Sequence, residues 1–437
     1  TRTLYLYTGE QFVVSSITSQ PAVIDEQKLV SFKFYRDDDN NYRVVHKSGQ
    51  VEHLRVRSSN GKPVALPHRV YAQSGHWIEL DYTDPPDTTH KCLKSIKDMA
   101  GKSLLEVEYV NRDRYNFHVA TRAKTGPSRA TYSVQLAGRD VRKVVLPTQD
   151  QGSWRFDYLK DPSTQNMTCL QRVAAPTGSV ETITYDNAGH RLPAGAPVER
   201  LPRVKRHVLD PQGGQKLIET EYTYSAENFM GGNSSASWRE GEDNLYQVGA
   251  SYVYSSTEQL VVQDEVVRQI VRTYDRHHLM TRQVTEQLGD VLDYDKADAP
   301  EQQWYVTQTT TAYHGDANVE FALQPPYFQL PKQVTEQWRM RHDSTRQRSE
   351  VREYGYDDAG NQTLEVQANG VRTVSEYYQP GDNEEDCPPD PHGFVRHLKN
   401  RTVYPSPGFE AQPPAPILRT NYRYGRHGSV LPSRQRT

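Results

Sequence analysis

The stretch YDDAGNQTLEVQANGVRTVSEYY, residues 356–378, carries the clearest strand and turn signals in the chain. It contains two turn signals: a first turn around Gly360, which is free to take a positive φ, and a second at Asn369-Gly370, which predicts a type I′ hairpin. Residues 363–367 and 371–377 alternate between β-branched or apolar and polar side chains, as strands do. Each such unit therefore adds a two-stranded antiparallel ribbon to a sheet.

Shorter repeated motifs precede this stretch. The pentapeptide QVTEQ occurs at residues 283–287 and again, unchanged, at residues 333–337. Tyr-Asp dipeptides occur at Tyr185-Asp186, Tyr274-Asp275 and Tyr294-Asp295. Degenerate repetition at intervals of tens of residues is typical of arrays built from small stacked units.

Strand patterns extend over nearly the whole chain. Alternation of period two is found, for example, at residues 104–110, 154–158 and 217–224, in segments rich in Tyr and β-branched residues and bounded by turn residues. Residues 260–271 also fit helical spacing, but their β-branched content favours a hairpin. The sequence therefore predicts an all-β protein.

The distribution of the repeated motifs also suggests how the chain is organised. These motifs are absent before about residue 175, so we expect a soft boundary near Pro176 between an N-proximal β region, residues 1–175, and a repeat-bearing region, residues 176–437. Three long polar or Pro-rich segments interrupt the second region, at residues 225–244, 379–393 and 405–416. Each is either an exposed connection between strands or a plug or docking surface for another part of the polypeptide.

The composition predicts a thin structure. Ala, Val, Ile, Leu, Met, Phe, Trp, Cys and Gly together make up about 35% of the 437 residues, against roughly 45–50% in ordinary globular domains. Tyr is abundant instead, with 28 copies against 10 Phe and 5 Trp. A sheet one layer thick, with water on both faces, needs few buried aliphatics and many amphipathic Tyr side chains, whose cross-strand pairs hold the register.

Several kinds of function find no support in the sequence. The net charge is −3, with both signs interspersed, which disfavours a nucleic-acid or anionic-lipid partner. No apolar run approaches the length of a membrane span, and the three Cys residues form no CxxC pair.

The acidic cluster at residues 37–41 lacks the Gly and Glu of a calcium loop and is predicted to be a hairpin turn. His277-His278 is predicted to be an ordinary pair of strand residues. We expect no catalytic residue, cofactor or metal.

Residues 356–378 resemble the YD repeat of the RHS family, whose pattern runs Tyr-Asp-x-x-Gly-Asn, a short strand, Asn-Gly-x-x-Thr, then Tyr-Tyr or Tyr-Asp. The repeat positions in the best copy are Tyr356, Asp357, Gly360, Asn361, Asn369, Gly370, Thr373 and Tyr377. Those in the eroded copies are Tyr185, Asp186, Gly189, Tyr274 and Asp275. Residues 390–403 also look like segments of large bacterial RHS proteins related to the shell-forming B component of Tc insecticidal toxins.

The resemblance implies a curved, spiralling antiparallel sheet of YD-repeat hairpins that forms part of a hollow cocoon. Such a shell is non-enzymatic and encloses a C-terminal toxin domain, of the same or a partner chain, until delivery. Its implied partners are a downstream part of the shell, the toxin domain and a delivery component of a secretion or toxin-complex system. The implied origin is bacterial, with synthesis in the cytoplasm and delivery outside the cell. The alternative is a carbohydrate-binding β-propeller or lectin-like surface module, which would show a regular blade period.

Overall fold

The computed structural model describes residues 2–85, 88–120, 127–291, 301–343, 345–407, 415–425 and 433–436. Nearly all regular structure in this part of the chain is β, as the alternation predicted. The exceptions are three 3-10 turns, η1 (Pro162–Thr164), η2 (Asn244–Gln247) and η3 (Phe321–Leu323). No helix within the described ranges is long and apolar enough to cross a membrane.

The strands outside the main sheet are β1 (Arg2–Tyr5), β2 (Gln11–Ser16), β3 (Val23–Ile24), β17 (His190–Arg191), β18 (Arg200–Leu201) and β31 (Ser433–Arg436). The strands of its first half are β4 (Phe32–Arg36), β5 (Asn41–His46), β6 (Val51–Ser59), β7 (Lys62–Tyr71), β8 (Trp77–Thr83), β9 (Cys92–Asp98), β10 (Ser103–Asn111), β11 (Arg114–Ala120), β12 (Arg129–Ala137), β13 (Asp140–Val145), β14 (Ser153–Leu159), β15 (Cys169–Ala174) and β16 (Val180–Tyr185). The strands of its second half are β19 (Val204–Asp210), β20 (Ile218–Tyr224), β21 (Tyr254–Val262), β22 (Glu265–Tyr274), β23 (Met280–Val291), β24 (Glu301–Tyr313), β25 (Pro331–Met340), β26 (Gln347–Tyr356), β27 (Gln362–Val366), β28 (Arg372–Tyr377), β29 (Leu398–Tyr404) and β30 (Leu418–Gly425).

Within the described ranges, the main sheet has 25 strands, from β4 to β30, and is not closed into a barrel. Each strand pairs antiparallel with the next strand of the sheet in sequence order, for example β15 with β16 and β16 with β19. The sheet thus runs without a break past residue 175, after which the repeated motifs begin. Because one continuous sheet replaces separate radial blades, the β-propeller alternative is wrong.

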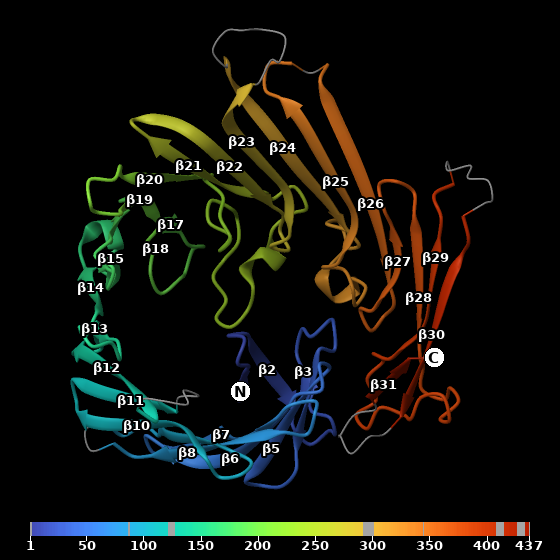
Figure 1. The fold of residues 1–437 in the computed structure, drawn as a ribbon, viewed down its shortest axis with the longest axis horizontal. Helices are drawn as coiled ribbons and strands as arrows, with labels where there is room; N and C mark the ends of the chain where they lie inside the picture. Colours follow the sequence, from blue (N-terminus) through green and yellow to red (C-terminus); the bar gives the residue numbers. More distant parts are fainter. Residues whose placement is uncertain are drawn as a thin grey trace.

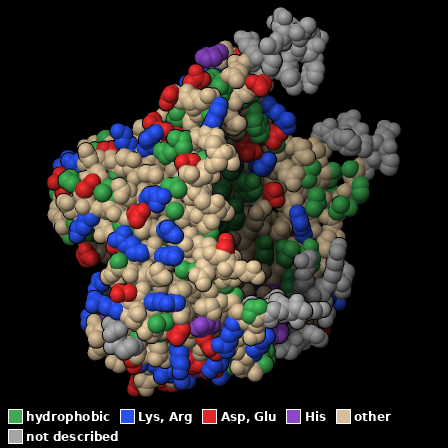
Figure 2. Space-filling model, turned by 60° about the vertical axis from the view of Figure 1, so that its left-hand side comes forward, with side chains coloured by type: hydrophobic (Ala, Val, Ile, Leu, Met, Phe, Trp, Pro, Cys, Tyr) green, Lys and Arg blue, Asp and Glu red, His purple; other side chains and the backbone are tan. Residues whose placement is uncertain are grey.

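This sheet forms a curved wall one layer thick. In Figure 1 it runs once around, from β5–β8 through β10–β15 and β19–β24 to β25–β30, and several loops and short strands lie on its inner side. The chain exposes 26599 Å², whereas a compact monomer of 50.0 kDa exposes roughly 17,000 Å². In Figure 2, charged side chains are scattered over the outer surface, and hydrophobic side chains gather around the hollow. The low apolar content therefore reflects a wall one layer thick, which buries little of its surface.

Both turns of the best repeat share one geometry. Gly360 N donates to Asp357 O at 2.8 Å, and Gly370 N donates to Gln367 O at 2.8 Å. Gly360 (φ 76°) and Gly370 (φ 82°) adopt the left-handed conformation, whereas Asn369 has no positive φ. Each turn is therefore a three-residue hairpin loop that ends in a left-handed Gly, and the type I′ prediction for Asn369-Gly370 is wrong.

The same turn also occurs in the N-proximal region, residues 1–175, which contains no Tyr-Asp dipeptide. At residues 98–102, Gly101 N donates to Asp98 O at 2.9 Å, and Gly101 has a φ of 79°. The Asp98 carboxylate accepts bonds from Ala100 N and Lys102 N. Asp357 accepts from the equivalent amides of its own turn. The string Asp-x-x-Gly was the available signal for this turn.

Three smaller predictions are settled by the strand bounds. Residues 260–271 lie in the β21–β22 hairpin, so the preference for strands over a helix is confirmed. The cluster at residues 37–41 forms the β4–β5 hairpin turn, in which Asp38 accepts bonds from the Asn40 and Asn41 amides. The pair His277-His278, however, lies in the turn between β22 and β23 and not in a strand, because Asp275 accepts bonds from the backbone amides on either side of His278.

Tyrosine side chains connect neighbouring strands in a way that the sequence did not specify. Near the end of a strand, a Tyr hydroxyl donates to a backbone carbonyl of the preceding strand, as Tyr185 does to Leu170 O at 2.7 Å. The other tyrosines of this kind are Tyr82, Tyr109, Tyr158, Tyr224, Tyr313 and Tyr377. The stabilising interaction is thus a hydroxyl–backbone bond, in addition to ring packing across strands.

We expect Tyr185→Phe to lower the free energy of unfolding by about 1 kcal/mol, because Leu170 O loses its side-chain donor. Tyr222→Phe is the matched control, since no hydrogen bond joins the Tyr222 hydroxyl to the described residues. Urea unfolding of both variants checks this. Equal losses in the two variants would contradict a role for the hydroxyl bond.

Alkaline pH is expected to unfold the wall. Burial raises the pKa of Tyr82, Tyr185, Tyr224, Tyr313 and Tyr377. The folded state therefore disfavours the phenolate, so this stability is fully present below the unfolded pKa of about 10 and is lost as pH rises through the raised folded values. Tyrosinate absorbance should rise in one cooperative step together with loss of the β circular dichroism signal. Gradual titration near pH 10 with an intact sheet would contradict this.

Candidate functional site: the seam that closes the wall

The two ends of the wall meet without pairing as strands. Within the described residues, β4 pairs with β5, and β30 pairs with β29 and β31. When consecutive antiparallel strands are neighbours, their connections lie alternately at the two rims of the sheet, where the strands end. The β5–β6 turn therefore lies on one rim, and the β26–β27 turn and the β28–β29 loop lie on the opposite rim. Yet these segments touch, through Lys47, Ala359 and Arg396. The wall therefore rises by one strand length as it turns, which is the spiral that was predicted.

We call the contact between residues 28–51 and residues 320–397 the seam. It is centred on the first turn of the best repeat, where the Asp357 carboxylate accepts bonds from Ala359 N (3.0 Å), Asn361 N (2.8 Å) and Asn361 Nδ2 (2.9 Å). Asn361, which is only 9% exposed, also donates from Nδ2 to Val395 O at 3.0 Å. The repeat motif thus builds a rigid turn and ties it to the β28–β29 loop.

Lys47 reaches this turn from the β5–β6 connection. Its Nζ donates to Ala359 O at 2.6 Å and to Asn361 Oδ1 at 2.7 Å. Burial lowers the pKa of Lys47, while the Asp357 carboxylate partly opposes that shift. Asn361 therefore acts on both sides of the seam, since its amide nitrogen binds within the C-terminal side and its oxygen accepts from the N-terminal side.

A buried ion pair lies next to this contact. The side chains of Asp390 and Arg396 are 4% and 10% exposed, and the guanidinium Nε lies 2.7 Å from Asp390 Oδ2. Arg396 also donates to Lys47 O across the seam. Asp390 accepts bonds from His392 N and Phe394 N, so residues 390–393 form a turn.

Apolar packing accompanies the polar contacts. Phe394 forms a buried cluster with Val45 and Val51, and Lys33 Nζ lies 4.7 Å from the centre of the Phe394 ring. Lys33 Nζ also donates to His392 O at 2.5 Å. Leu29 fills the space beside Gly360, so that a Cβ at Gly360 would lie 2.8 Å from Leu29 Cδ2. The seam is thus a packed interface of polar and apolar groups.

The seam continues into loops that lie inside the ring (Figure 1). Lys28 Nζ donates to Ala322 O (2.9 Å) and Gln324 O (3.0 Å) of the β24–β25 loop. The Phe321 ring of that loop stacks on Tyr246, with 4.7 Å between ring centres. Tyr246 belongs to the β20–β21 loop, residues 225–253, which contains the fully buried Leu245. This long polar loop is therefore packed against other loops and is not exposed along its whole length.

The predicted repeat residues are spread along the wall. Asp357, Gly360 and Asn361 lie at the seam, whereas Tyr377 bonds to Gln362 O and the buried Thr373 lies in β28. Asp186 Oδ2 lies 2.7 Å from Arg203 Nη2 in an ion pair. Gly189 lies close to the backbone of Leu201, and a Cβ added at Gly189 would lie 2.7 Å from Leu201 O. The rings of Tyr274 and Tyr254 stack with 5.1 Å between their centres. The Asp275 carboxylate accepts a bond from His277 N in the β22–β23 turn. Tyr294-Asp295 lies outside the described residues.

Sequence reasoning missed the N-terminal side of the seam. Phe394 and Arg396 lie in the stretch that resembles segments of RHS proteins, but nothing distinguished Lys28, Lys33 or Lys47 from other lysines. Their partners are backbone carbonyls about 300 to 360 positions away in the chain. A single sequence carries no pattern for such contacts.

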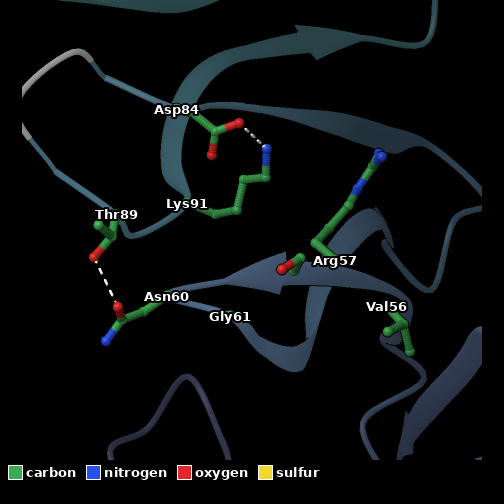
Figure 3. A pocket seen from close by; sticks show the side chains of 8 residues that line it. Val56, Arg57, Asn60, Gly61, Asp84, Thr89 and Lys91 are labelled. Atoms are coloured by element: carbon green, nitrogen blue, oxygen red, sulfur yellow. Dashed lines mark hydrogen bonds and ion pairs between the residues drawn. The ribbon is translucent and has the colours of Figure 1, made fainter.

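A surface hollow lies between the β6–β7 turn and the β8–β9 loop (Figure 3). Figure 3 shows Asp84 and Lys91 facing each other as an ion pair, and Thr89 directed at Asn60. The ion pair lies within the β8–β9 loop, and the Thr89–Asn60 bonds join this loop to the β6–β7 turn, which gives the hollow a structural explanation. In the described ranges, no group of three or more His, Cys, Asp or Glu side chains is placed to hold a metal ion.

Comparisons with known proteins give distant likenesses only. No family model matches the chain, and no curated protein matches it. A crystal structure of TcdB2-TccC3-TEV is similar over 91% of this chain and 22% of its own, with 11% identity and a TM-score of 0.27. The Tc holotoxin pore of Photorhabdus luminescens is similar over 97% of this chain and 21% of its own, with 12% identity and a TM-score of 0.33. The chain thus spans about a fifth of the length of these Tc toxin components.

Proposed function

We propose that this chain is a non-enzymatic wall segment of an RHS-type shell that encloses a toxic polypeptide until delivery. The observation that carries the proposal is the continuous single-layer sheet of 25 strands, curved around an interior and closed on itself by the seam. A wall of this kind separates two aqueous spaces, which a compact sandwich cannot do.

The distribution of stabilising interactions supports this role. Buried hydrophobic residues are few and belong mainly to small clusters at the N-terminal strands, the inner loops and the seam. Between these clusters, the wall is held by backbone ladders and Tyr–carbonyl bonds. An enclosing wall needs this arrangement, because both of its faces must remain hydrated.

The partners and location follow from the shell. The contents would be a toxin domain in the same or a partner chain, next to a downstream part of the shell, and a delivery component would carry the assembly out of a bacterium. Residues 176–437 would be the repeat-bearing part of the wall, and residues 1–175 its N-proximal part. The repeat positions would act as turn and register determinants.

Co-expression tests the proposal. Residues 1–437 would be produced with the coding sequence that follows them, and the products treated with a protease of broad specificity. We expect the downstream polypeptide to survive in the folded assembly and to be digested after unfolding in urea. Digestion at the same rate with and without residues 1–437 would refute enclosure.

A further inference from the structure

The ends of the wall are joined by side-chain contacts and not, as neighbouring strands are, by a backbone ladder. The β23–β24 pair is continuous from Arg282↔Thr310 to Val291↔Glu301, with backbone hydrogen bonds along its length. At the seam, no backbone-to-backbone pair joins the two sides within the described residues. The hydrogen bonds there join side chains of one side to backbone or side-chain oxygens of the other.

These contacts come mainly from long cationic side chains. Lys28, Lys33 and Lys47 each reach a carbonyl oxygen on the C-terminal side, and Arg396 reaches back to Lys47 O. Such side chains can leave their acceptors by rotation about their own bonds, without any change of backbone conformation. Water can then replace the donor on each carbonyl.

Burial makes the closed seam less favourable than its bond lengths suggest. Closure desolvates Lys33 and Lys47, whose pKa values burial lowers. The charged form that binds best is therefore the one that burial penalises. The apolar part of the seam is small: in the described part of the chain its cluster consists of the buried Phe394, Val45 and Val51 with the partly buried Tyr35 and Tyr71 packed against them.

Resting on the proposed shell function, we propose that the wall parts along this seam to admit or release its contents, while all 25 strands remain paired. The elements that separate are the β5–β6 turn and residues 28–33 on one side, and residues 320–324 of the β24–β25 loop, the β26–β27 turn and residues 390–396 on the other. Opening requires no ladder hydrogen bond to break, whereas parting the wall anywhere else does.

The test uses two matched pairs of substitutions. The seam variant carries Lys33→Met and Lys47→Met. The control carries Lys91→Met and Lys97→Met, two lysines that bind Asp84 and Asp81 within the wall, far from the seam. Small-angle X-ray scattering should show a larger maximum dimension for the seam variant alone, with the β circular dichroism of both variants unchanged. Unchanged dimensions would overturn the proposal.

A cross-link supplies the converse test. Lys47→Cys and Ala359→Cys, joined by a short bismaleimide in a Cys92→Ser/Cys169→Ser background, should hold the seam shut. In the co-expressed assembly, protease cleavage of the contents should be about tenfold faster or more in the seam variant than in the control, because each lysine removed is a charge-assisted bond lost. Cleavage in the cross-linked protein should be slower than in the uncross-linked one.

The outcomes separate this inference from the proposed function. Contents that are protected in the parent and remain equally protected in the seam variant would overturn the seam as the opening line and leave the shell intact as a proposal. Contents that are unprotected in the parent would refute the shell, and the scattering comparison would still decide whether the seam opens.

Discussion

Arg396→Met is expected to lower the free energy of unfolding by about 3–5 kcal/mol, the cost of leaving one charge of a buried pair uncompensated. The carboxylate of Asp390 is 4% exposed and accepts bonds from two backbone amides, and Arg396 is the side chain that forms an ion pair with it among the described residues. The substitution also removes the donor that Lys47 O receives across the seam. Urea-induced unfolding, followed by circular dichroism, measures the change.

Two further variants make the Arg396 prediction specific. Arg172→Met removes an exposed partner of Asp157, with side chains 44% and 56% exposed, and should cost at most about 1 kcal/mol. Adding Asp390→Asn to Arg396→Met removes the orphaned charge but keeps an oxygen to accept the turn amides, so part of the lost stability should return. A cost for Arg396→Met no greater than that for Arg172→Met would contradict the buried pair.

Local patterns in the sequence were sufficient to predict the strands. Alternation depends on neighbouring residues only, so the β21–β22 hairpin and the turns at Gly360 and Gly370 could be placed from their own residues. Low apolar content correctly indicated a thin sheet with few buried apolar residues. The detailed turn type at Asn369 failed because a left-handed Gly alone can close a three-residue loop, and Asn-Gly suits both geometries.

The seam could not be predicted in the same way. Its position depends on how far the sheet rises in one turn, which is the sum of small twists and bulges over 25 strands. Lys47 reaches the carbonyl of Ala359 only because that sum brings opposite rims of the sheet next to each other. The roles of Asp357 and Asn361 in their own turn were visible in the motif, but their role in closing the wall was not.

Gly360→Ala is expected to be the most damaging substitution of a single glycine in the repeat, at about 2–5 kcal/mol. Ala at a φ of 76° costs about 1–2 kcal/mol of backbone strain. The new Cβ would in addition lie 2.8 Å from Leu29 Cδ2, a contact that must be relieved by a shift at the seam and costs about 1–3 kcal/mol more. Gly101 separates the two contributions, because it occupies the same Asp-x-x-Gly turn with a φ of 79° and a Cβ added there would meet nothing within 4 Å.

Gly101→Ala should therefore show only the strain, and the difference between the two variants measures how tightly the seam is packed. Leu29→Ala provides the second leg of a double-mutant cycle: combined with Gly360→Ala it should remove the clash, so that the pair costs less than the sum of the single changes. Thermal and urea unfolding of the four variants give the coupling free energy. If Gly360→Ala and Gly101→Ala cost the same, Leu29 does not pack against the repeat turn, and the wall is not closed at this point.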